Sequence, residues 1–169
     1  MITFQADILP LKNELYRLAL RITMNAAEAE DVVQETMMKV WNRREQWEQI
    51  ESIEAFCLTI CRNLSLDKLR RMDNQTQSLD GSYDPKDQHV ASNPEEQAVQ
   101  RDRIQLVRQL INQLPEKQRS CMQLRDMEGK SYKDIAAILD ITEEQVKINI
   151  FRARQTIKER FQKIEKIKK

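Results

Sequence analysis

Glycine, proline and aromatic residues are all scarce in this sequence. Of 169 residues only two are Gly and four are Pro, and the aromatic residues make up 5%. Strands are enriched in aromatic residues and their turns in Gly and Pro, so this composition disfavours a β-sheet protein. Charged residues, by contrast, make up 33% of the chain. This balance is typical of amphipathic helices, and we expect an all-α fold.

Metal-binding and nucleophilic side chains are equally few. The chain has three cysteines and a single histidine, His89. An odd number of cysteines without CxxC spacing argues against a disulfide framework or a zinc site. Cys57 and Cys61 lie one helical turn apart, where small core residues are commoner than a redox pair. With no glycine-rich phosphate loop and no plausible catalytic triad, we expect no catalytic or metal-binding residue and no cofactor, hence no enzyme.

Long hydrophobic runs are also missing, and no stretch approaches the roughly 18 apolar residues that a membrane span needs. The N-terminus shows no basic segment followed by an apolar run. We therefore expect a cytoplasmic protein without membrane insertion.

Charge is distributed unevenly, although the formal net charge is only +1. Residues 95–169 carry seventeen Lys and Arg against twelve Asp and Glu, whereas residues 1–71 carry ten against eleven. The basic excess therefore lies in the C-terminal part, which favours a nucleic-acid partner there.

Three helices are predicted in the N-terminal part. The first spans 7–23, with Pro10 tolerated in its first turn. The second begins after the capping residue Asn25 and runs to about Arg44, and the third begins after the capping residue Ser52. The apolar stripe of the second is Ala29, Val32, Val33, Thr36, Met37, Val40 and Trp41, and that of the third is Phe56, Cys57, Ile60, Cys61 and Leu64.

The stretch 73–93 has no apolar period and is rich in Asn, Asp and Ser, which predicts a flexible linker between a domain of residues 1–72 and one of residues 94–169. Pro94 then opens a helix. Pro115 opens another, which Gly129 ends. Because the two domains have separate apolar faces, we expect the free protein to sample several relative domain positions. In a closed form, the faces carrying Ile148 and Phe151 or Met38 are expected to pack on the other domain.

Two capping patterns follow one another in the segment 131–157. Ser131 with Asp134, and Thr142 with Gln145, predict two successive helix starts. The first helix has an apolar face of Ile135, Ala136, Ile138 and Leu139, and the second one of Val146, Ile150, Ala153 and Ile157. The pattern is that of a helix-turn-helix.

Ile148 and Phe151 lie on the face opposite to Val146 and Ile150, where they point away from the core. An apolar pair among cations suits the DNA major groove, because cations bind phosphates and apolar groups contact thymine methyls. The alternative is that another helix covers this face.

These segments together resemble the extracytoplasmic-function (ECF, group 4) sigma factors of bacterial RNA polymerase. AEAEDVVQETMMKVW resembles region 2.2, which binds the clamp helices of core RNA polymerase. FCLTICRNLSLDKLRR resembles regions 2.3 to 2.4, which open and read the minus-ten element. The stretch 114–154 resembles region 4, which reads the minus-thirty-five element and contacts the polymerase flap. The resemblance implies a region 2 helical bundle and a region 4 helix-turn-helix, with core RNA polymerase, promoter DNA and an anti-sigma factor as candidate partners.

Site residues follow from the resemblance, position by position. Asn63 matches the position that captures a flipped-out base, and Trp47 falls where the family has an aromatic beside it. The polymerase-binding set is Asp31, Gln34, Glu35 and Met38. The minus-ten set is Trp47, Arg62, Asn63, Lys68, Arg70 and Arg71, and the minus-thirty-five set is Lys147, Ile148, Phe151, Arg152 and Arg154.

One departure from the family pattern stands out, because Ile148 and Asn149 occupy positions where many members have Ser-Arg. The family's usual minus-thirty-five contacts are therefore not assumed for this chain. Two other readings stay open. One is a helix-turn-helix transcription regulator whose N-terminal helices serve dimerisation or partner binding. The other is a helical interaction protein without a DNA role, which requires the helix 142–157 to be buried on all sides.

Overall fold

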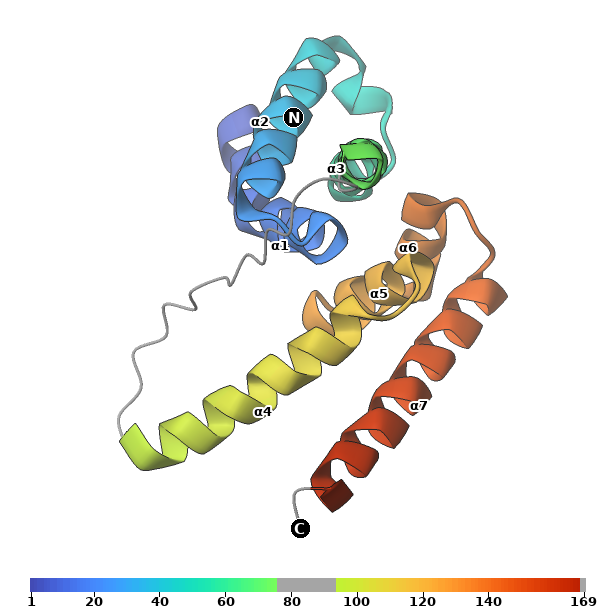
Figure 1. Cartoon of the computed structure of the whole chain (residues 1–169). Helices are drawn as coiled ribbons and strands as arrows, with labels where there is room; N and C mark the ends of the chain where they lie inside the picture. The colour runs from blue at the N-terminus through green and yellow to red at the C-terminus, as the bar shows by residue number, and fades with distance from the viewer. Residues whose placement is uncertain (76–93, 168–169) are drawn as a thin grey trace.

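The computed structural model describes residues 1–75 and 94–167, and all regular structure within these ranges is helical (Figure 1). The all-α prediction is confirmed. The predicted linker lies mostly outside the described residues, apart from 73–75, which continue the third helix. The α-helices are α1 (Lys12–Thr23), α2 (Ala26–Asn42), α3 (Ile53–Gln75), α4 (Pro94–Asn112), α5 (Glu116–Met122), α6 (Tyr132–Leu139) and α7 (Glu143–Ile167).

The first helix is broken where the sequence predicted a continuous one. A π-helical turn, η1 (Phe4–Ile8), and a 3-10 turn, η2 (Leu9–Leu11), precede α1. Pro10 lies in η2 and has no N–H to donate, so it interrupts the regular hydrogen-bond pattern. The helical path also begins earlier than predicted, since the Thr3 hydroxyl accepts from the Ala6 N–H.

The next two helices begin at the predicted caps. The Asn25 side-chain oxygen accepts from the Glu28 N–H at 3.0 Å, and the Ser52 hydroxyl accepts from the Ala55 N–H at 3.2 Å. A 3-10 segment, η3 (Arg44–Gln49), connects α2 to α3. Local sequence is therefore sufficient to place both helix starts.

The helices α1, α2 and α3 pack mutually around one apolar core. Of the predicted α2 stripe, all but Met37 and Trp41 are buried, and Met37 is half-buried. Trp41 is 46% exposed, so its predicted burial was wrong. It lies at the end of α2, where its ring makes edge contacts with Phe4 and Trp47 and Arg44 covers one face.

The C-terminal half builds a second group of helices. A π-helical turn, η4 (Gln123–Met127), continues α5, and Gly129 follows at a left-handed φ of 68°, as expected for a helix stop. α7 packs against α5, α6 and α4, and Val146, Ile150 and Ala153 form its buried stripe.

The two halves are packed against each other in a closed form. The expectation that the free protein samples several relative domain positions stays a prediction. α3 contacts α6 and α1 contacts α5, as Figure 1 shows. A single cluster of buried residues runs from Ile8 to Ile150 through both halves. Ile148, Phe151 and Met38 do not make this contact, since all three remain exposed. The expected closed-form packing through those residues was therefore wrong.

Candidate nucleic-acid interface and partner surface

The outer face of α2 carries the four residues predicted to bind polymerase. Asp31, Gln34 and Glu35 are exposed, and Met38 is 66% exposed in their midst. A large apolar side chain among carboxylates is costly to leave in water and suits a protein partner. The sequence placed all four residues on one face, and the structure leaves that face uncovered within the described residues.

A shallow hollow of about 250 Å³ surrounds Asn63 on the adjoining face of α2 and α3. Asn63 is exposed at its rim and offers both a hydrogen-bond donor and an acceptor. Phe56 contributes an aromatic wall, and the Arg43 guanidinium lies 5.8 Å from its ring centroid. The hollow is lined by Lys39, Arg43, Phe56, Thr59, Ile60, Asn63, Leu64 and Asp67.

Trp47 does not line this hollow, although the resemblance placed an aromatic there. Its side chain is only 5% exposed, and its indole N–H donates to the Val40 carbonyl at 3.0 Å. Trp47 therefore supports the end of α2 from inside, and Phe56 is the aromatic residue beside Asn63.

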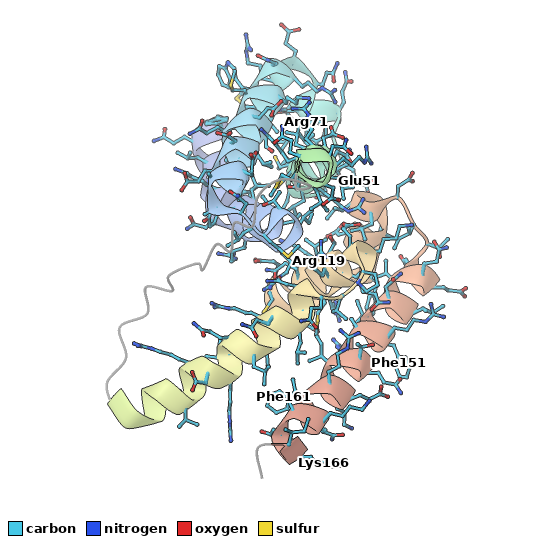
Figure 2. The ribbon with its side chains drawn as sticks, viewed as in Figure 1. Glu51, Arg71, Arg119, Phe151, Phe161 and Lys166 are labelled. Carbon is cyan, nitrogen blue, oxygen red and sulfur yellow. The ribbon has the colours of Figure 1, made fainter. Side chains whose placement is uncertain are left out.

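The four cations predicted to contact minus-ten DNA have different surroundings. Arg62 is buried and makes a bidentate ion pair with Glu116 of α5, at 3.1 and 2.9 Å. Lys68 reaches Glu28 at 3.3 Å and Asp31 at 3.8 Å, so it links α3 to α2. Arg70 and Arg71 are exposed on α3. Arg70 pairs with Asp67 at 3.4 Å, and Figure 2 labels Arg71. The described structure therefore presents two of the four to solvent.

The recognition segment forms as the sequence predicted. Ser131 accepts from the Asp134 N–H at 3.1 Å. Thr142 and Gln145 form a reciprocal capping box, with the Gln145 N–H donating to Thr142 at 3.1 Å and the Thr142 N–H donating to Gln145 at 3.0 Å. Asp140 supplies the left-handed turn between the two helices, with φ of 55°.

The outward face of α7 is open to solvent. Ile148 is 47% exposed and Phe151 is 67% exposed, and Figure 2 shows Phe151 on the side of α7 turned away from α4. The helix is therefore not buried on all sides. Burial on all sides was required by the alternative of a helical interaction protein without a DNA role, so this alternative is not supported.

The three cations around this face have different surroundings. The Arg152 side chain is exposed to solvent. Arg154 is paired with Asp126, and hydrogen bonding to that carboxylate raises the Arg154 pKa. The Lys147 ammonium lies 5.4 Å from the ring centroid of Tyr132. Asn149 donates to the Gln145 carbonyl at 2.7 Å, so its amide nitrogen is engaged by its own helix.

Several residues in these surfaces were missed by sequence reasoning. Arg43 follows the end of α2 and Phe56 lies in α3, and no spacing rule links them to Asn63. Tyr132 and Arg125, on either side of Gly129, are separated by a turn whose geometry the sequence alone does not define. The one available signal was that Phe56 falls on the apolar stripe but near the helix start, where coverage by neighbours is incomplete.

The cysteine thiols are buried and unsuited to chemistry at neutral pH. Burial raises the pKa of Cys57, Cys61 and Cys121 to about 12. In the described ranges no three His, Cys, Asp or Glu side chains gather as a metal site. Nor does any helix of residues 1–75 or 94–167 combine the length and apolar character that would let it cross a membrane.

Comparison with known protein families gives two matches that together cover most of the chain. A family described as Sigma-70 region 2 matches residues 8–75. A second, described as Sigma-70, region 4, matches residues 104–157. The first covers α1 to α3 with the hollow at Asn63, and the second covers the helix-turn-helix.

Curated relatives are similar in sequence to this chain over most of its length. The chain is 31% identical to the RNA polymerase sigma-H factor of Pseudomonas aeruginosa over 162 residues, which cover 91% of this chain and 83% of the relative. It is 36% identical to the ECF RNA polymerase sigma factor SigL of Mycobacterium tuberculosis over 136 residues, covering 79% and 74% respectively.

Solved structures share the fold. The sigma factor RpoE in complex with the anti-sigma factor NepR from Bartonella quintana superposes with a TM-score of 0.72 at 27% identity, covering 92% of this chain and 94% of that one. CnrH in complex with the cytosolic domain of CnrY superposes with a TM-score of 0.68 at 18% identity, covering 94% and 87%, which shows the fold alone.

Proposed function

The chain belongs to the ECF family of RNA polymerase sigma factors, and we propose that its two halves divide the family's work, with residues 1–72 binding core polymerase and the minus-ten element and residues 94–169 binding the minus-thirty-five element. As a sigma factor it binds RNA polymerase and initiates transcription, and it has no enzymatic activity of its own. This assignment of functions to the two halves is supported by one observation. The region 2 and region 4 matches lie on separate helix groups, each with its own outward surface.

In this proposal the outer face of α2 binds core polymerase. Asp31, Gln34, Glu35 and Met38 combine exposed acidic and apolar groups, which suit a basic and apolar partner surface such as the polymerase clamp helices. In the second half, α4 and α7 enclose an open hollow of about 450 Å³ with Leu106, Phe161 and Ile164 in its lining. This apolar hollow is our candidate for the contact with the polymerase flap.

Minus-ten recognition falls to the hollow around Asn63. A hollow of about 250 Å³ with an aromatic wall and an amide at its rim has room for one extruded base. Phe56 offers the ring on which a base can stack, and Asn63 can both donate to and accept from its edge. Arg70 and Arg71 lie further along α3, where they can reach phosphates of the opened strand.

Asn63→Ala is expected to weaken discrimination at a single minus-ten position and to leave core binding unchanged. The physical reason is that alanine removes both hydrogen bonds to the base edge but leaves the apolar walls of the hollow intact. Each such bidentate contact is worth about 1 to 3 kcal/mol of base discrimination. The measurement is run-off transcription from promoters changed at one minus-ten position at a time. If the native chain and Asn63→Ala rank those promoters identically, Asn63 does not read a base.

Minus-thirty-five recognition falls to the outward face of α7. Ile148 and Phe151 lie exposed between cations, an arrangement that supports insertion into the major groove with Lys147, Arg152 and Arg154 toward the phosphates. Arg154 would have to be shared between Asp126 and DNA.

An anti-sigma factor is a further proposed partner. Support comes from one similar solved structure, in which the sigma factor RpoE is bound to the anti-sigma factor NepR. The shared fold and sequence similarity to RpoE support the same class of regulator for this chain.

The decisive experiment for the function is reconstitution with core RNA polymerase. The full chain is expected to associate with core and to direct run-off transcription from a subset of genomic fragments. The rival reading, a helix-turn-helix regulator that dimerises through its N-terminal helices, predicts DNA binding without core association. A chain that binds DNA as a dimer and is not retained by core polymerase would overturn the proposal.

A further inference from the structure

A cluster of arginines lies where the end of α1 meets α4 and α5. Arg21 is in the last turn of α1, and its guanidinium donates to the side-chain oxygen of Gln123 at 2.9 Å and to that of Asn112 at 3.3 Å. Arg108 lies one turn before Asn112 on α4, and residues four apart share a helix face. Arg108 therefore lies on the side of α4 that faces Arg21, and both arginines are half-buried.

A third arginine adds to this cluster from α5. The Arg119 side chain is only 6% exposed, and it donates to the carbonyls of Leu114 at 3.0 Å and Ile22 at 3.3 Å. Ile22 lies in the last turn of α1 and Leu114 just beyond the end of α4, where partial negative charge gathers. The Nε atom of Arg119 is buried and has no hydrogen-bond partner among the described residues. Arg119 is therefore fixed by backbone carbonyls and keeps its full positive charge inside the cluster.

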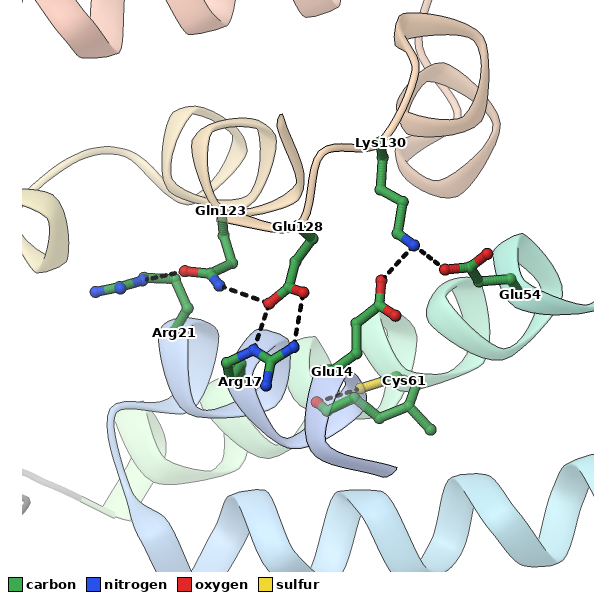
Figure 3. Close-up of polar contacts among 9 residues, drawn as sticks. Glu14, Arg17, Arg21, Glu54, Cys61, Gln123, Glu128 and Lys130 are labelled. Atoms are coloured by element: carbon green, nitrogen blue, oxygen red, sulfur yellow. Dashed lines mark hydrogen bonds and ion pairs between the residues drawn. The ribbon is translucent and has the colours of Figure 1, made fainter. Parts of the chain in front are cut away.

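No carboxylate compensates the charge of Arg21. Among the ion pairs of the described residues, none includes Arg21 or Arg119. Glu128 is occupied by Arg17, whose guanidinium donates to it at 2.5 and 2.8 Å. Figure 3 shows the Gln123 side chain between Glu128 and Arg21, bonded to both. The side-chain oxygens that contact Arg21 thus belong to neutral amides.

The cluster carries uncompensated positive charge in a partly buried place. Burial, together with the charges of Arg108 and Arg119, lowers the pKa of Arg21 to about 10, so Arg21 stays charged at neutral pH. A charge that is removed from water without an opposite charge beside it costs free energy. An anion that approaches Arg21 and Arg108 from solvent offsets part of this cost through charge-assisted hydrogen bonds.

The number and shape of the cations indicate the class of anion. A guanidinium presents a planar fork of N–H donors that matches the oxygens of a phosphate group. A terminal phosphate carries a charge of about −1.5 to −2 at neutral pH, close to the two positive charges of Arg21 and Arg108. A carboxylate, or a phosphodiester of DNA, carries only one negative charge per group. Because both arginines are half-buried, a small ligand reaches them more readily than a duplex does.

We propose that Arg21 and Arg108 bind the terminal phosphate of a small ligand, with Arg119 as the buried residue that adds positive charge to the site. The ligand class is inorganic phosphate or a phosphate monoester such as a nucleotide. None of the three arginines belongs to the predicted polymerase-binding or DNA-binding sets. The inference goes beyond the proposed function and does not depend on it.

The test is calorimetric titration of the full chain at constant ionic strength. Its probes are inorganic phosphate, adenosine monophosphate and adenosine, with chloride as the reference anion. At least one phosphate-bearing probe is expected to bind one-to-one with a dissociation constant of about 1 mM or tighter, and adenosine is expected not to bind. The tighter of the two phosphate probes identifies whether the site takes free phosphate or an ester. Saturating ligand should also raise the melting temperature, because it binds the folded chain.

Two charge-removing variants and one control define the site. Arg21→Gln and Arg108→Gln are each expected to weaken phosphate binding about 10-fold or more, because each removes a charged donor. Arg101→Gln is the matched control, since Arg101 is an exposed arginine on the same face of α4, two turns and roughly 10 Å from Arg108. Arg119 is left unchanged, because its loss would deprive the carbonyls at two helix ends of their donor.

Two further variants separate charge from geometry. Arg21→Lys keeps the charge but loses the planar fork, so it is expected to stay folded and to weaken phosphate binding less than Arg21→Gln. Arg108→Glu places a carboxylate beside Arg21 and takes the place of the ligand. It is expected to abolish phosphate binding, while in chloride it should melt no lower than Arg108→Gln.

The outcomes decide the inference without reference to transcription. Failure of both phosphate-bearing probes to bind the native chain overturns it, as does phosphate binding by Arg21→Gln and Arg108→Gln that equals that of Arg101→Gln. If neither probe binds and the two variants instead bind a DNA duplex more weakly than the native chain, the arginines serve nucleic acid and the proposal is also overturned. Thermal melting of each variant distinguishes lost binding from lost folding. The sigma function is tested separately, by the reconstitution with core polymerase.

Discussion

A chain carrying Asp31→Lys together with Glu35→Lys is expected to lose core polymerase binding and all core-dependent transcription while remaining folded. Both carboxylates are exposed on the outer face of α2 beside Met38, where four units of charge change would be felt by any basic partner surface. Charge repulsion at a protein interface costs several kcal/mol, enough to abolish a specific complex. The measurement is retention by immobilised core polymerase, followed by run-off transcription.

Folding stability should hardly change in this variant. Asp31 lies 3.8 Å from Lys68, but Lys68 keeps its closer partner Glu28 at 3.3 Å. Exposed pairs of this kind contribute about 0 to 1 kcal/mol, so the melting temperature should fall only slightly. Glu30→Lys with Glu45→Lys is the control, because Glu30 lies about 100° around the helix from Asp31 and Glu45 lies beyond its end. Full core affinity in the Asp31 and Glu35 variant would contradict the assignment of this face.

The second large effect is expected at the minus-thirty-five element, where replacing thymine by uracil should weaken binding at the positions that Ile148 and Phe151 reach. Both side chains are exposed and apolar, and the only apolar group in the major groove is the thymine methyl. Phe151→Ala and Ile148→Ser should each cost about 1 to 3 kcal/mol of discrimination at particular base pairs. The measurement is holoenzyme affinity for promoter duplexes with single uracil substitutions.

Lys147→Ala provides the contrasting control, because loss of a phosphate contact should weaken binding to all duplexes and make the salt dependence shallower. In the Phe151→Ala variant the remaining uracil effect at its position should vanish, since the methyl no longer has a partner. Binding that is insensitive to uracil at every position would show that Ile148 and Phe151 do not read methyls. They would then be assigned to contact with a protein partner.

Local chemistry was sufficient for the helix starts and for the recognition helix. Capping by Asn25, Ser52, Ser131 and Thr142 depends on residues three positions apart, so it could be predicted without knowledge of the fold. The exposure of Phe151 was likewise predictable, because helical periodicity alone separates the two faces of α7. The first helix was predicted less well, since the π-helical and 3-10 turns around Pro10 depend on how the N-terminus packs.

The direction of individual side chains was beyond local rules. Trp41 was predicted buried and is 46% exposed, whereas Trp47 lies inside and leaves Phe56 as the aromatic beside Asn63. Arg62 and Arg70 are both arginines of α3 that were predicted to contact minus-ten DNA. Arg62 is buried against Glu116, 54 residues away, whereas Arg70 is exposed. Such differences depend on which helix covers each position.

The sequence by itself determined that this protein is helical and which face of α7 is turned outward, because composition, capping and periodicity are local properties. It also determined the family, through the resemblance of its motifs to the ECF sigma factors. Only the tertiary structure decided that α3 packs on α6, that Arg62 is held by Glu116, and that Arg125 and Lys147 meet at Tyr132. Each of these contacts joins residues from different helices, and their meeting depends on how the helices pack, a relation that no spacing within one helix encodes.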